Sequence, residues 1–174
     1  MDRNIKTRIR KKGGGLIIAL LLFIIPSRCL CEELFNSKSS VEELSNSVLE
    51  ALMKKDIKVL ENLAMTRDEF YKYIWPEIPW SRPKTNMPFE YYWKDLHQKS
   101  STSLRWILSE YGGQKFEFIK IYFAKDKRQY KKLNIYRDSR LIVEDEKGKQ
   151  KEIELFGSIV ELNGRYKILS YIYR

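Results

Sequence analysis

The hydrophobic period of the chain changes once, at Gly112 and Gly113. Before this pair, apolar residues recur every three or four positions, which is typical of helices; after it, they alternate with polar residues, which is typical of strands. Asn163 and Gly164 predict a type I′ turn between the last two strands. We therefore expect an α+β fold, in which N-terminal helices pack on a curved four-stranded antiparallel sheet as a single domain over residues 40–174.

The first three helices are predicted from their N-terminal caps. Ser40 with Glu43 and Thr66 with Glu69 match the capping-box pattern, in which each partner binds a free backbone N–H of the other. Asp56 can cap a short helix between them. Three helices are therefore expected before residue 75.

A segment with four prolines, residues 75–88, follows these helices and predicts a loop. A fourth helix should begin at Pro88, which suits a first helical turn, and end at the glycine pair. One face of this helix is expected to be buried. That face carries Phe89, Trp93, Leu96, Ser100, Leu104, Ile107 and Tyr111.

Four strands are expected in the second half of the chain. Apolar residues change phase near Ile119, which predicts a bulge in the first strand. Gly157 lies in the third, where a curved sheet would bend. The expected strands cover residues 116–123, 133–144, 151–162 and 165–173.

Residues 1–31 have the layout of a secretory signal peptide. A basic start precedes the apolar run Leu16–Ile25, whose ten residues are fewer than the roughly 20 needed to cross a bilayer. Cleavage is expected between Cys31 and Glu32, so that residues 32–39 form a flexible lead-in to a secreted or periplasmic protein. The alternative is an uncleaved leader that anchors the protein in the membrane. Acylation of a leader cysteine is disfavoured because neither cysteine follows a small residue.

Most of the basic character belongs to this leader. The chain has 33 Lys and Arg residues and 23 Asp and Glu residues, and residues 1–31 hold seven of the former and one of the latter, so the net charge falls from +10 to +4 without them. A nucleic-acid partner is therefore not expected. The remaining basic cluster is interpreted as a solvated turn. It consists of Lys125, Lys127, Arg128, Lys131 and Lys132.

The segment from Phe156 to Ile168, with its Asn-Gly turn followed by Arg-Tyr-Lys-Ile, resembles a late hairpin of the nuclear transport factor 2-like superfamily. The resemblance extends to the order of helices and strands, and residues 75–100 look like a class of uncharacterised bacterial exported proteins. It implies a curved sheet wrapped by helices into a cone, with a pocket or a dimer surface on the concave side. A homodimer through the sheet is one expectation from it.

Large aromatic faces and directional donors are concentrated in the proline-rich loop and the helix that follows it. This mixture is found in polar ligand pockets and at interface anchors, so we predict a non-enzymatic domain that binds a small molecule or a partner protein. The alternative is structural: the tryptophans plug the cone, and Arg82 and Asn86 satisfy loop carbonyls. The candidate binding residues are Trp75, Trp80, Arg82, Asn86, Tyr92, Trp93, His97 and Lys99.

The second candidate function is a hydrolase or isomerase that uses Asp95 or His97 in the cone. Enzymes of the superfamily work with a carboxylate base and an acidic hydrogen-bond donor, but no motif of this chain matches either. Asp95 and His97 lie about 200° apart around a helix, so they do not face each other. His97 is the only histidine, and no cofactor or metal motif is present, so we expect no cofactor and no metal.

Overall fold

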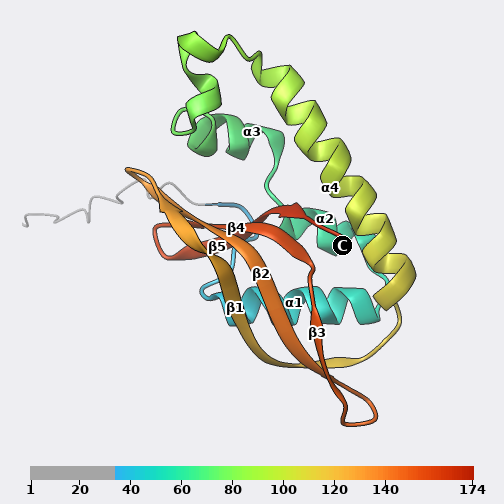
Figure 1. Cartoon of the computed structure of the whole chain (residues 1–174). Coiled ribbons are helices and arrows are strands. Elements are labelled where there is room, and N and C mark those ends of the chain that lie inside the picture. The colour runs from blue at the N-terminus through green and yellow to red at the C-terminus, as the bar shows by residue number, and fades with distance from the viewer. Residues whose placement is uncertain (1–33) are drawn as a thin grey trace, which may run out of the picture. The chain divides into compact units, whose positions relative to one another are not determined.

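The computed structural model describes residues 34–174 (Figure 1). The predicted signal peptide and its cleavage site lie outside the described residues. Within them the fold is α+β, with the helices before the sheet, as the change of period predicts. Every helix of this part is too short or too polar to cross a bilayer. The helical elements are α1 (Val41–Met53), α2 (Ile57–Leu63), α3 (Arg67–Glu69), the π-helical turn η1 (Phe70–Ile74), the 3₁₀ turns η2 (Pro79–Ser81) and η3 (Pro83–Thr85), and α4 (Phe89–Tyr111).

The helix starts follow their predicted caps. Thr66 and Glu69 form a complete capping box at α3, and Asp56 accepts a hydrogen bond from the backbone N–H of Val59 at 3.1 Å. At α1 the Ser40 hydroxyl accepts from the backbone of Glu43, but the Glu43 carboxylate accepts from Ser39, one residue earlier than the pattern predicts. Local sequence therefore determines where these helices begin.

The sheet is antiparallel, in the order β1-β2-β4-β5, and the short β3 also pairs with β2. It has five strands because the third expected strand is interrupted at residues 154 and 155. Leu155 is fully buried there and does not pair with β2. Beside this gap, Asp138 of β2 adopts a left-handed φ of 51°. The strands are β1 (Phe116–Gln129), β2 (Leu133–Asp145), β3 (Gln150–Ile153), β4 (Phe156–Leu162) and β5 (Arg165–Tyr171).

Two further features of the strands follow from the sequence. The register between β1 and β2 shifts between Phe118 and Lys120, which confirms the predicted bulge. Gly157 lies where a Cβ atom would come within 2.9 Å of the Ser170 hydroxyl, so a side chain at the bend would require this hydroxyl to move. In contrast, β1 extends to Gln129, so much of the basic cluster lies in a strand and not in a turn.

Apolar clusters cover both faces of the sheet. On one face, α1 and α2 pack on Leu141, Ile159 and Ile168. On the other, η1 and the N-terminal part of α4 pack on Ile135 and Val160. Figure 1 shows α1 on one side of the strands and α3 with the start of α4 on the other. The neighbours Ile159 and Val160 point in opposite directions, and both are fully buried.

A buried ion pair connects α3 to β5. The Lys167 ammonium, whose side chain is 0% exposed, donates to both oxygens of Glu69 at 2.9 and 2.8 Å. Burial by itself raises the pKa of Glu69, but hydrogen bonds from Lys167 and from the backbone N–H groups of Thr66 and Phe35 hold it below its usual value. Glu69 therefore connects the helical layer, the sheet and the start of the described chain.

Residues 34–39, the described part of the expected lead-in 32–39, lie against the outer edge of β5. Lys38 and Tyr166 exchange two backbone hydrogen bonds of 2.9 and 2.8 Å, and Leu34 is 3% exposed. Arg165 holds this segment through Ser37. The β5 edge is thus covered.

Candidate functional site

A pocket of about 190 Å³ lies between the proline-rich loop and the sheet, and we call it the loop pocket. Its roof is formed by the loop and the start of α4, and its floor by β1, β2, β4 and β5. The lining residues are Phe70, Ile74, Ile78, Pro79, Trp80, Tyr92, Leu96, Arg128, Tyr130, Ile135, Arg137, Ser158, Leu169 and Ser170.

The roof is held in place by hydrogen bonds inside the loop. The Thr85 hydroxyl lies 2.7 Å from both the Trp80 and the Arg82 carbonyl oxygens, and the Ser81 hydroxyl donates to Ile78 at 2.8 Å. If the loop residues were purely structural, Arg82 and Asn86 were expected to bind the loop carbonyls. In the structure Thr85 binds them instead. Trp80 keeps 48% of its surface exposed at the pocket mouth.

An aromatic cluster forms the wall. Phe70, which is 1% exposed, lies 5.9 Å from the ring of Tyr92 and 5.4 Å from that of Trp93. Trp75 packs on Tyr92 and on Phe89 at 5.6 and 5.4 Å. These rings interlock the π-helical turn with the first turns of α4, so the wall is built from packed and not from mobile side chains.

The floor carries positive charge. Arg137 is opposite Ser158 in the ladder, and Arg128 of β1 is opposite Ile135, two residues before Arg137. The Arg137 Nη2 atom donates to the carbonyl of Asp126 at 3.3 Å, whereas its buried Nε has no acceptor. The Arg128 side chain makes no hydrogen bond or ion pair within the described residues. An apolar pocket thus has two cations on its floor.

None of the described residues that line the loop pocket is acidic or a histidine. Burial raises the pKa of Tyr92, so its hydroxyl stays protonated at neutral pH and is able to donate a hydrogen bond. The lining can therefore hold an acceptor, but it provides no carboxylate or imidazole base.

The predicted site residues fall into three groups in the structure. Trp80 and Tyr92 line the loop pocket, and Trp75 supports it through Tyr92. Trp93 and His97 line a second pocket, which shares Leu96 and Leu169 with the loop pocket. Like Trp75, the last three line neither pocket; they are Arg82, Asn86 and Lys99.

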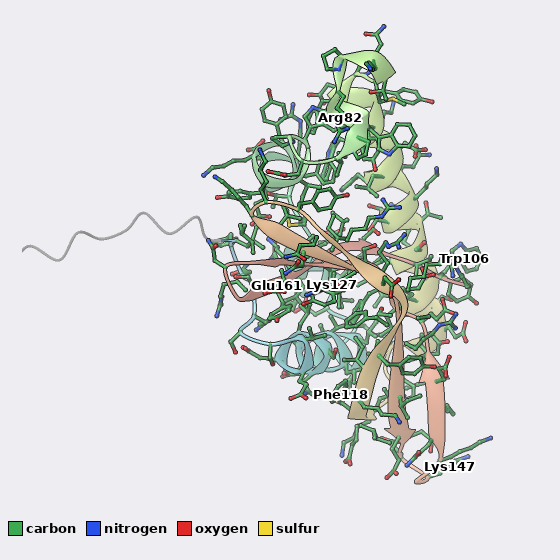
Figure 2. The ribbon with its side chains drawn as sticks, turned by 60° about the vertical axis from the view of Figure 1, so that its left-hand side comes forward. Arg82, Trp106, Phe118, Lys127, Lys147 and Glu161 are labelled. Atoms are coloured by element: carbon green, nitrogen blue, oxygen red, sulfur yellow. The ribbon has the colours of Figure 1, made fainter. Side chains whose placement is uncertain are left out.

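The side chains of Arg82, Asn86 and Lys99 are exposed. Arg82 lies in the loop between η2 and η3 (Figure 2), and Asn86 ends η3 in a left-handed conformation with φ 44°. Lys99 pairs with Asp95 at 2.8 Å along the outer face of α4. Asp95 is therefore engaged on the surface and does not line either pocket.

The second pocket has a volume of about 50 Å³. Glu61, Ser100, Ser101 and Tyr171 lie around it with His97, whose ring is 5.5 Å from that of Trp93. A space of this size holds one or two waters, whereas pockets for drug-sized ligands span roughly 300–1,000 Å³. The half-buried Glu161, which accepts hydrogen bonds from Tyr136 and Asn134, also lines neither of these pockets.

We expect His97→Gln to change the free energy of unfolding by less than about 0.5 kcal/mol, because the side chain is exposed and its described contact is one ring face. Thermal melts of the variant and the wild type should run parallel between about pH 5 and 8, the range in which a histidine switch acts. A pH-dependent gap between the two curves in this range would instead give His97 a specific role.

Sequence analysis missed the floor of the loop pocket, in particular Arg128, Tyr130 and Arg137. The signal was present for Arg128, since it belongs to the basic cluster that was interpreted as a solvated turn. Leu133, Ile135 and Arg137 are alternate residues of β2 and therefore lie on the same face of the strand. A cation that follows two apolar residues on one face indicates a polar site there.

No protein-family model matches the chain, and neither a curated protein nor a solved structure matches it. Within residues 34–174, no three His, Cys, Asp or Glu side chains lie in an arrangement that can hold a metal ion. Function is therefore inferred from the geometry of the loop pocket.

Proposed function

We propose that the chain is an exported, non-enzymatic domain that binds a small molecule in the loop pocket. The observation that carries the proposal is the lining itself: apolar and aromatic side chains with a few convergent donors and no acid or imidazole. Ligand sites are usually concave and mostly apolar, with a small number of polar groups that orient the ligand. Membership of the nuclear transport factor 2-like superfamily, with its pocket beside a curved sheet, is part of this proposal.

The packing of the roof supports a pocket that is formed before the ligand arrives. Thr85 fixes the loop carbonyls, and Phe70, Trp75 and Tyr92 interlock behind Trp80. A preformed site loses little conformational entropy when it binds. The volume of about 190 Å³ favours a ligand smaller than a typical drug molecule.

The test is ligand-observed NMR with a set of small fragments, half of them neutral, on the wild type and on Trp80→Ala. We expect several fragments to bind and Trp80→Ala to weaken them by about tenfold, because the indole closes the mouth of the pocket. Trp106→Ala is the matched control, since Trp106 is 57% exposed, stacks on Tyr173 and lies away from the loop (Figure 2).

Both tryptophan variants should melt within a few degrees of the wild type, because each ring is about half exposed. Equal effects of Trp80→Ala and Trp106→Ala on fragment binding, or no fragment bound by the wild type, would contradict the proposed site.

A further inference from the structure

Two arginines on the floor of the loop pocket have no carboxylate partner within 4.0 Å among the described residues. Arg137 has one acceptor, the Asp126 carbonyl, for its five N–H donors. Its Nε is buried without any acceptor, and it is the one buried side-chain polar atom of the described residues in this condition. The Arg128 side chain, on the neighbouring strand, has neither a hydrogen bond nor an ion pair within residues 34–174.

The acidic group next to Arg137 in the chain is already engaged. Asp138 binds Lys125 at 2.5 Å and lies 3.8 Å from Arg174, and these cations lower the pKa of its carboxyl group. The floor therefore has a surplus of positive charge beside apolar walls. Arg137 is half-buried, and a half-buried cation without a carboxylate partner is unfavourable. An anion in the pocket relieves this cost, because charge-assisted hydrogen bonds to arginine are strong.

The other lining residues indicate the chemistry of the uncharged part of the ligand. Phe70, Ile74, Leu96 and Leu169 line it with apolar surface, and Trp80 covers its mouth. Tyr92 and Tyr130 place hydroxyl groups near Arg128, and burial raises the pKa of Tyr92, which keeps that hydroxyl a donor. The cations lie on the floor, while the roof is mostly apolar and contributes the Tyr92 hydroxyl as a donor.

We propose that the loop pocket binds a small organic monoanion, namely an apolar group that carries one carboxylate. The carboxylate lies against Arg137 and Arg128, and the apolar group lies beneath Trp80 against Phe70 and Leu96. The planar guanidinium fork matches the two oxygens of a carboxylate, which a point charge such as lysine does not. This inference rests on the proposed function and specifies its ligand class.

The test compares octanoate with octanamide, which has the same apolar tail and no charge, by isothermal titration calorimetry on the full exported domain. We expect octanoate to bind at least about tenfold more tightly. Arg137→Gln should remove most of that difference and leave octanamide unchanged, and Arg128→Gln should remove part of it. Arg82→Gln is the control, because this exposed arginine lies on the loop and outside the pocket (Figure 2).

Arg128→Gln keeps the test valid if Arg137→Gln does not fold, because the Arg128 side chain is exposed. Equal affinity for octanoate and octanamide, or equal losses in Arg128→Gln and Arg82→Gln, would overturn the ligand class. If neutral fragments still bind and Trp80→Ala weakens them, the proposed function stands without the proposed ligand class. If neither fragments nor octanoate bind, the proposed function and the ligand class both fail.

Discussion

Replacing Glu69 with alanine is expected to lower the free energy of unfolding by about 3–5 kcal/mol, as when one partner of a buried ion pair is removed. The variant leaves the Lys167 ammonium, which is 0% exposed, without its carboxylate. It also removes the acceptor for the backbone N–H groups of Thr66 and Phe35. Urea unfolding of the two proteins at neutral pH measures the difference.

Asp68→Ala is the matched control for this variant. Asp68 is the preceding residue of the same helix, but its side chain is 92% exposed and pairs only with Arg67 at 3.2 Å. Its replacement should change stability by less than about 0.5 kcal/mol. A loss in Glu69→Ala no larger than in the control would show that the buried pair does not hold α3 on β5.

The same pair predicts a dependence on pH. The pKa of Glu69 in the folded protein lies below its ordinary value of 4.5, so the folded state favours the ionised form. The resulting stability is fully present above about pH 4.5 and is lost as the pH falls through the lower folded-state pKa. Glu69→Ala should therefore lose less stability on acidification than the wild type does.

Phe70→Ala is expected to cost about 3–5 kcal/mol of stability, in the range of large-to-small aromatic substitutions in a core. Phe70 is 1% exposed and contacts Phe89, Tyr92 and Trp93, so its removal leaves a cavity between the π-helical turn and α4. The loop pocket should lose fragment binding as well, because this ring forms its wall. Denaturant unfolding together with fragment NMR tests both effects.

Tyr71→Ala provides the comparison for Phe70→Ala. Tyr71 is the next residue, is 55% exposed and makes one edge contact with Phe89 at 4.8 Å. Its loss should stay below about 1.5 kcal/mol. Similar losses in the two variants would mean that the aromatic wall is not a packed core.

Local signals predicted the helices well. The capping boxes, Asp56 and the glycine pair act within one helical turn, so the helix boundaries can be derived from neighbouring residues. The buried face of α4 also followed from its period: Leu104 and Ile107 are buried, and Phe89, Trp93 and Leu96 are half-buried.

The floor of the pocket could not be derived in this way, because it depends on pairing between distant strands. Two register shifts in β1 decide that Arg128 is opposite Ile135. The change of apolar phase near Ile119 predicts the first, but no nearby residue signals the second, between Lys125 and Arg128. The partner of Lys167 is Glu69, 98 residues earlier in the chain. The aromatic residues of the site could be predicted from the sequence because Trp80 and Tyr92 are near each other in the chain. The charged residues could not, because they lie on strands that come together only in the folded protein.

The proposed function requires that ligands bind in the loop pocket. An amide ¹H–¹⁵N NMR titration with octanoate tests this most directly. We predict that shifts concentrate on the floor at Ile135, Arg137 and Ser158 and on α4 at Tyr92 and Leu96. Shifts confined to the exposed loop around Arg82, with the floor strands unchanged, would contradict it.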